Sequence, residues 1–130
     1  MRDRSARYRP RRGSVVPVDV GPYACPMATT FVIEYTIDPS KIDAFEAYAD
    51  EWMRLVEREG GTHHGYFMPS EGASDRALAL FSFESLSEYE RYRTNFGVDP
   101  EFIAADLLRV DSGCVIRWDR TLMRPHLPSR

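Results

Sequence analysis

Apolar residues recur along the chain with two different periods, and these periods predict its strands and helices. Residues 31–37 (FVIEYTI) carry an apolar side chain at every second position, which is typical of a strand with one fully apolar face. From residue 39 to about residue 58 or 59, apolar residues recur at three- and four-residue spacing until a glycine pair follows, which predicts a long amphipathic helix. Asp38 and Pro39 favour its start, because aspartate caps a helix and proline fits its first position.

The same patterns continue to the end of the chain. We predict further strands over residues 62–68, 76–84 and 114–122, and further helices over residues 85–95 and 99–111. The polar loop between the second and third strands is short enough to join them as a hairpin. The order strand, helix, strand, strand, two helices, strand predicts an α+β, ferredoxin-like fold, with a four-stranded antiparallel sheet and helices on one face.

The third predicted strand is apolar on both of its faces. Phe81 and Phe83 lie on one face, and Leu78 and Leu80 lie on the other. Helices on one side of the sheet can cover only one of these pairs, so the other pair would be exposed in a monomer. We therefore expect a homodimer that forms through the open sheet face, with the two copies related by a two-fold axis.

The beginning of the chain differs from the rest in composition. Residues 1–26 hold six arginines, two aspartates and four prolines, and we expect a disordered basic extension over residues 1–29. Because the composition changes at Met27, we expect Met27 to be the biological start. Residues 30–125 then form one domain and residues 126–130 a tail. The net charge of −3 is the sum of +4 in residues 1–26, from six arginines and two aspartates, and −7 in the rest of the chain, from 11 basic and 18 acidic residues. The acidic balance of the domain argues against a nucleic-acid partner.

The remaining composition indicates a cytoplasmic protein. No run approaches the roughly 20 apolar residues that a membrane span requires, and no segment matches a secretory signal. Cys25 and Cys114 match neither a metal-binding spacing nor a CxxC redox motif, so we interpret them as structural thiols in a reducing compartment. We expect no membrane partner.

The adjacent histidines His63 and His64 are the strongest candidates for chemistry. Neighbours in a strand point to opposite faces, so the pair is poorly placed to share a metal ion, and we expect no metal site. One of the two could face a pocket and act in acid–base catalysis, with Tyr66 on the same face as His64. In the alternative, one histidine packs against the helices or a dimer partner and the other lies in water.

A second group of residues could line a binding pocket. These candidates are Glu34, Trp52, Tyr92 and Arg93. For Glu34 we expect a structural ion pair with Arg117 of the last strand. We expect Trp52 and Trp118, as large side chains, to be core residues rather than platforms on which a ligand stacks. No phosphate loop, nucleophile elbow or zinc spacing is present in the sequence, and we expect no cofactor.

Four segments of the chain together resemble the NIPSNAP family. They are FVIEYTIDPSKIDAFEAYADEW, HHGYFMPSEG, FSFESLSEYERYR and DPEF, and the resemblance covers residues 30–125. It implies a dimeric α+β barrel, formed when the sheets of two copies face each other. It implies no reaction, because most bacterial members of the family have none assigned.

The sequence and this resemblance leave two functions open. The first is a small homodimeric protein of unassigned activity that binds a small hydrophobic molecule. The second is a cofactor-independent monooxygenase or isomerase that acts on a small hydrophobic substrate. The fold supports both classes, so the choice depends on the site rather than on the family.

Overall fold

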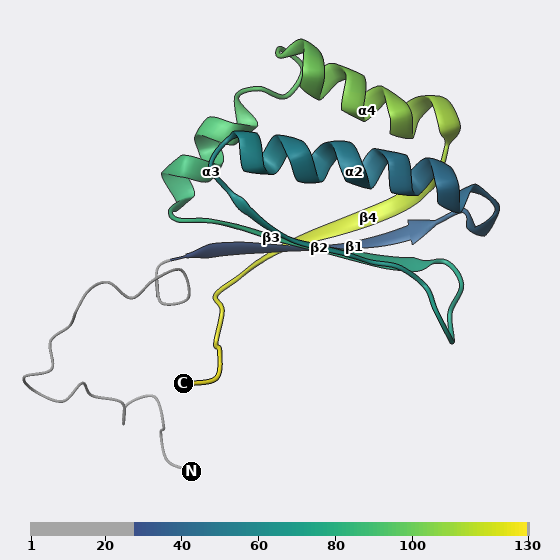
Figure 1. Ribbon diagram of the computed structural model, residues 1–130, viewed down its shortest axis with the longest axis horizontal. Helices are drawn as coiled ribbons and strands as arrows, with labels where there is room; N and C mark the ends of the chain where they lie inside the picture. Colours follow the sequence, from purple (N-terminus) through teal and green to yellow (C-terminus); the bar gives the residue numbers. More distant parts are fainter. Residues whose placement is uncertain (1–27, 130) are drawn as a thin grey trace, which may run out of the picture.

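The computed structural model describes residues 28–129, which form one sheet and one layer of helices (Figure 1). The elements are β1 (Thr29–Ile37), the short 3-10 helix η2 (Pro39–Lys41), α2 (Ile42–Arg58), β2 (Thr62–Phe67), β3 (Arg76–Phe83), α3 (Leu86–Arg93), α4 (Pro100–Ser112) and β4 (Val115–Met123). The predictions for the basic extension before residue 28 lie outside the described residues. None of the helices within residues 28–129 has the length and apolar character needed to cross a membrane.

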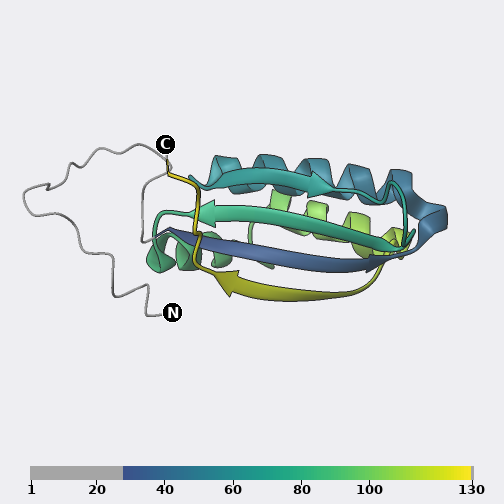
Figure 2. The same ribbon diagram turned by 90° about the horizontal axis from the view of Figure 1, so that it is seen from below.

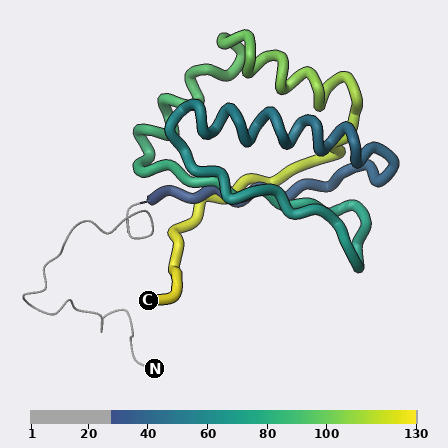
Figure 3. The backbone as a smooth tube through the Cα atoms, viewed as in Figure 1, coloured from purple at the N-terminus to yellow at the C-terminus, as the bar shows by residue number. Residues whose placement is uncertain are grey.

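The four strands form one antiparallel sheet in the order β2-β3-β1-β4. Figure 2 shows the strands side by side in this order, with all the helices behind them. This arrangement confirms the predicted α+β, ferredoxin-like fold. Because β1 and β4 are antiparallel neighbours, the start of β1 and the end of β4 lie at the same end of the sheet (Figure 3).

The helices begin where the sequence places their caps. The Asp38 side chain accepts a hydrogen bond from the Ser40 backbone N–H at 2.9 Å, and the turn it caps is 3-10 before α2 begins at Ile42. The Ser85 hydroxyl accepts from the Glu88 N–H at 3.1 Å at the start of α3. These local hydrogen bonds fix the residues at which the two helices begin.

One face of the sheet packs on the helices and forms the core. Alternate residues of the two central strands point to this side and are buried or nearly so: Phe31, Ile33, Tyr35 and Ile37 of β1, and Ala77, Ala79, Phe81 and Phe83 of β3. They meet the buried face of α2, which includes Phe45 and Leu55. The predicted alternation of β1 is therefore confirmed, and of the two pairs in β3 it is the phenylalanines that face the helices.

The opposite face of the sheet carries no element of the described part of the chain (Figure 1). Val32, Leu78 and Leu80 are half-buried at its centre, and Phe67 is 52% exposed at its side. This open face also carries polar side chains, among them Glu34, so it is mixed rather than wholly apolar.

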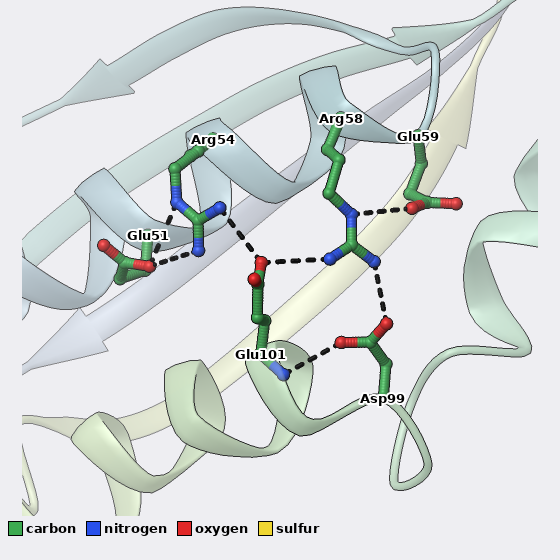
Figure 4. Close-up of polar contacts among 6 residues, drawn as sticks. All are labelled: Glu51, Arg54, Arg58, Glu59, Asp99 and Glu101. Carbon is green, nitrogen blue, oxygen red and sulfur yellow. Dashed lines mark hydrogen bonds and ion pairs between the residues drawn. The ribbon is translucent and has the colours of Figure 1, made fainter.

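An ion-pair cluster fixes α4 against the end of α2 (Figure 4). The Arg58 guanidinium donates to Glu59 at 2.9 Å, to Asp99 at 2.9 Å and to Glu101 at 3.0 Å. Arg54 also donates to Glu101 at 3.0 Å, and Asp99 accepts from the Glu101 backbone N–H at 2.8 Å. Asp99 thus caps α4 and ties it to α2, which sets the position of the helix layer above the sheet.

Candidate functional site

A cavity of about 110 Å³ lies between the helices and the sheet. Every strand and every α-helix contributes at least one side chain to its wall. Most of the wall is aromatic, and its polar atoms belong mainly to tyrosine, histidine and tryptophan side chains. Representative wall residues are Tyr48, Trp52, His63, Tyr66, Tyr92 and Trp118. A mainly aromatic wall with a few polar and charged groups is typical of small-molecule sites, but this cavity is smaller than the roughly 300–1,000 Å³ of sites for drug-sized ligands.

Strand β2 builds one side of the cavity through a β-bulge. Its pairing with β3 shifts by one residue between His63 and Gly65, and Gly65 has a φ of +111°, which favours glycine. His63 therefore pairs opposite Phe81, and Tyr66 pairs opposite Ala79, so both face the helices. Their rings stack with centroids 5.1 Å apart and planes 9° apart.

The bulge corrects the predicted partnership of Tyr66 with His64. Strict alternation put these two residues on one face, but the extra residue of the bulge brings His63 to the side of Tyr66 instead. The Nε2 atom of His64 lies 2.8 Å from the Ser82 hydroxyl, on the open face. The two histidines therefore point to opposite faces, as predicted, and cannot bind one metal ion together.

His63 is held as a neutral imidazole with its proton on Nε2. The Gly65 backbone N–H donates to Nδ1 of His63 at 2.9 Å, so Nδ1 is the acceptor and Nε2 carries the hydrogen. Burial lowers the pKa of His63 to about 4, the charge of the neighbouring His64 adds to the effect, and Glu57 opposes it. In this state the ring offers the cavity a hydrogen-bond donor rather than a base.

Four tyrosines of the cavity, Tyr35, Tyr48, Tyr66 and Tyr92, are neutral hydroxyl groups. Burial is the main cause that raises the pKa of Tyr35, Tyr48, Tyr66 and Tyr92 above the usual value, and neighbouring tyrosines raise it further. A raised pKa means that no phenolate forms near neutral pH. These side chains can donate and accept hydrogen bonds, but they add no charge to the cavity.

Trp52 lines the cavity, and its indole N–H is a buried donor without a partner in the described part of the chain. Its ring contacts Tyr48, Tyr92 and Phe96, with centroids 6.3, 6.5 and 5.4 Å away. Its indole Nε1 is buried and has no hydrogen-bond partner among residues 28–129. A buried donor without a partner costs about 1–3 kcal/mol. A bound acceptor would remove that cost.

Two arginines lie at the β4 side of the cavity. The Arg109 guanidinium donates to Asp106 at 3.0 Å and lies 4.9 Å from the centroid of the Trp118 ring. The Arg120 guanidinium lies 6.0 Å from the ring centroids of both Phe31 and Tyr89. Within the described part of the chain, no carboxylate lies within 4.0 Å of Arg120.

The structure brings together some of the candidate pocket residues and separates others. Trp52 and Tyr92 line the cavity with His63 and Tyr66. Arg93 does not line it; its guanidinium donates to the Tyr89 hydroxyl at 3.0 Å on the exposed side of α3.

Glu34 lies apart from the cavity, on the open face of the sheet. The expected ion pair between Glu34 and Arg117 is wrong. In the register of β1 with β4, Glu34 stands opposite Asp119 and Arg117 stands opposite Thr36. Arg117 pairs with Asp119 of its own strand at 3.0 Å.

Among the cavity residues that were not predicted as site residues are Tyr48, Trp118 and Arg120. Tyr48 was missed because its position in α2 gives no signal beyond the apolar stripe. Trp118 was expected in the core, but it is 48% exposed because β4 is an edge strand and the helices leave it partly uncovered. Arg120 was also missed, although its alternation with Arg117 and Asp119 along β4 placed it on the helix side.

The fold and the cavity define a class: a ferredoxin-like α+β domain with an aromatic cavity between sheet and helices. Residues 31–129 match the model of the NIPSNAP family. The chain therefore belongs to the NIPSNAP family. Among the curated proteins, a comparison found no match.

Solved structures of other proteins share the fold at low identity. A NIPSNAP family protein of unknown function from Agrobacterium tumefaciens is 19% identical, with a TM-score of 0.65 over 77% of this chain and 89% of that one. An uncharacterized NIPSNAP-like domain protein from Burkholderia xenovorans is 18% identical, with a TM-score of 0.65 over 81% and 90%. A putative antibiotic biosynthesis monooxygenase from Bacteroides thetaiotaomicron is 15% identical, with a TM-score of 0.59 over 82% and 97%.

Proposed function

We propose that this NIPSNAP-family protein is a cytoplasmic homodimer that binds a small hydrophobic molecule in the cavity between its sheet and its helices. The observation that supports this most strongly is the unpaired, buried indole N–H of Trp52 in an aromatic wall. A protein interior rarely leaves a buried donor without a partner, and a site for a ligand is one of the reasons that it does.

The chemistry of the wall favours a ligand with an apolar body. Trp52, Tyr66 and Tyr92 present ring faces and edges to the cavity, which suits flat or aliphatic groups. The hydroxyl, imidazole and indole groups are few and fixed, so they would orient the ligand rather than dominate its binding energy.

The homodimer follows from the one-sided helix layer. A second copy that packs its sheet on the open face would cover Val32, Leu78 and Leu80 and the exposed Phe67 ring. The polar side chains on the same face, such as His64, would lie between the two sheets or at the rim. Light scattering on the purified chain at micromolar concentration should give twice the mass of one chain, and the mass of a monomer would contradict this part of the proposal.

Binding fits the site better than acid–base catalysis does. A monooxygenase or isomerase stays as the second candidate because His63 stacks on Tyr66 inside the cavity. Catalysis by His63 as a general base would need a free ring nitrogen toward the substrate, whereas Nδ1 accepts from Gly65 and Nε2 carries the proton. The lowered pKa further weakens the ring as a base at neutral pH.

The test uses the adjacent histidines as a matched pair. The wild-type protein and the variants His63→Ala and His64→Ala are purified, and the small molecules retained by each are identified by mass spectrometry after denaturation. We expect a retained apolar compound in the wild type and in His64→Ala, and a reduced amount in His63→Ala, because only His63 lines the cavity.

Each outcome separates the candidates. Equal loss in both variants, or no retained compound in protein purified without detergent, would contradict binding in this cavity. Release of a chemically altered compound by the wild type and an unaltered one by His63→Ala would favour the enzyme.

A further inference from the structure

We propose that the ligand of this cavity is a small anion, a single-ring aromatic carboxylate, whose carboxylate is bound by Arg120 while its ring lies among the aromatic side chains. This inference rests on the proposed binding function and adds the charge, size and chemical class of the ligand.

The charges around the cavity do not balance. Among the charged side chains that line it, Asp106 and Arg109 neutralise each other at 3.0 Å, which leaves the Arg120 guanidinium as an uncompensated positive charge. Burial keeps the tyrosines neutral, and His63 is neutral as well. An anion supplies the missing charge, and a guanidinium binds a carboxylate with two parallel hydrogen bonds.

The position of Arg120 suits a charged group at the edge of an apolar cavity. Its side chain is exposed on the helix-facing side of the edge strand β4, while its guanidinium lies near the rings of Phe31 and Tyr89. A carboxylate bound there would remain partly hydrated, so its charge would not have to be carried into the apolar interior. The attached ring would then point inward.

The interior of the cavity offers hydrogen-bond donors but, among the described residues, no second unpaired cation, because Arg109 is paired with Asp106. The Trp52 indole N–H has no partner, and the Nε2–H of His63 has no acceptor among the hydrogen bonds of the described residues. Both suit an oxygen acceptor on the ligand, such as a carbonyl or ring hydroxyl. A ligand that carries only donors would leave these two groups unpaired.

The size of the cavity limits the ligand to about one ring. A cavity of about 150 Å³ lined by apolar side chains holds a benzene molecule, and this one has about 110 Å³. This volume is smaller than that of the benzene site, so a single six-membered ring is the upper limit, with its carboxylate outside at the open side. Polycyclic ligands would need the helices to move.

The test compares benzoate with benzamide, which has nearly the same shape but no charge. Titration calorimetry measures the affinity of both for the full-length protein and for the variants Arg120→Gln and Arg91→Gln. Arg91 is the control, because it is an exposed arginine of α3 that neither lines the cavity nor lies on the open sheet face, and its replacement changes the net charge equally. Neither variant alters a buried side chain.

We expect the wild type and Arg91→Gln to bind benzoate about 2- to 5-fold more tightly than benzamide, because an exposed ion pair contributes up to about 1 kcal/mol. In Arg120→Gln the two affinities become similar. Trp52→Phe keeps an aromatic ring but lacks the N–H. It should weaken the binding of both probes about 3- to 10-fold, because each probe has an oxygen that could accept from this N–H.

Three results would overturn the inference. Equal affinity of the wild type for benzoate and benzamide shows that the cavity binds apolar molecules without selecting an anion, which leaves the proposed binding function intact. If both arginine variants weaken the binding of benzoate equally, the effect is one of net charge and there is no carboxylate site at Arg120. The absence of benzoate binding contradicts this inference, whereas the binding function is contradicted only if the wild type also retains no compound in the mass-spectrometry test.

Discussion

Replacing Gly61 by alanine should destabilise the protein through a steric conflict at the junction of α2 and β2. An added Cβ would lie 2.8 Å from two atoms of the Phe83 ring and 2.9 Å from Cγ1 of Val56. Both neighbours are 1% exposed, so neither can turn toward solvent. The backbone of Gly61 is not in the left-handed region, so no backbone strain adds to the packing conflict.

The distances set the size of the effect. Carbon atoms in contact are most stable at about 3.5–4.0 Å, so the new methyl group is roughly 0.6 Å or more too close to its neighbours. Packed cores lose about 1–3 kcal/mol when they must absorb such an added group. Against a total stability of about 5–15 kcal/mol for a domain of this kind, a loss of that size is easily measured.

A double-mutant cycle in urea tests this explanation. Circular dichroism gives the free energy of unfolding for the wild type, Gly61→Ala, Val56→Ala and the double variant. Val56→Ala removes one of the clashing atoms and gives Phe83 room to move, so the double variant should lose less than the sum of the single losses by about 0.5 kcal/mol or more. A Gly61→Ala variant within about 0.5 kcal/mol of the wild type, or strict additivity, would refute the packing conflict.

Three further predictions concern the bulge, the buried histidine and the ion-pair cluster. Gly65→Ala should lower the free energy of unfolding by about 1–2 kcal/mol from backbone strain alone, because the added Cβ meets no atom within 4 Å. Gly72→Ala, with a φ of +102° and equally open surroundings, should lower it by a similar amount. An unchanged stability of Gly65→Ala would count against a strained bulge. Since the pKa of His63 falls from 6.5 to about 4 on folding, the unfolded chain binds the extra proton between these pH values. As the pH is lowered from 6.5 to 4, the stability of the wild type should therefore fall by about 1–2 kcal/mol relative to that of His63→Gln, after allowance for solvent screening. If the two stabilities depend on pH in the same way, the pKa of His63 is not lowered in the folded protein. Arg58→Gln should lower the urea midpoint, and 1 M NaCl should narrow the difference from the wild type; identical midpoints in low salt would show that the cluster does not hold α4.

The fold could be predicted because its elements are specified locally. Asp38-Pro39 and Asp99-Pro100 each join a capping side chain to a proline suited to a first helical turn, and both mark true helix starts. The alternation of residues 31–37 likewise follows from a strand with one buried face. Such signals depend on neighbours in the sequence, which is why the order of elements was confirmed.

The site could be predicted only in part because it depends on register and on contacts between distant segments. The extra residue of the bulge in β2 places His63, rather than His64, on the same face as Tyr66. The only sequence signal for this bulge was the glycine Gly65 inside a strand pattern. The false pair of Glu34 with Arg117 has a similar cause, because the register between β1 and β4 cannot be inferred from either strand alone.

The most direct test of a ligand in the cavity is the NMR signal of the Trp52 indole N–H during a titration with benzoate. The chain has two tryptophans, so ¹⁵N-labelled tryptophan gives two indole signals, and Trp118→Phe assigns them. Because the Trp52 Nε1 has no partner in the structure, a ligand acceptor should move its proton signal downfield in a saturable way. A Trp52 signal that stays in place at saturating benzoate, while the protein remains folded, would contradict ligand binding in this cavity.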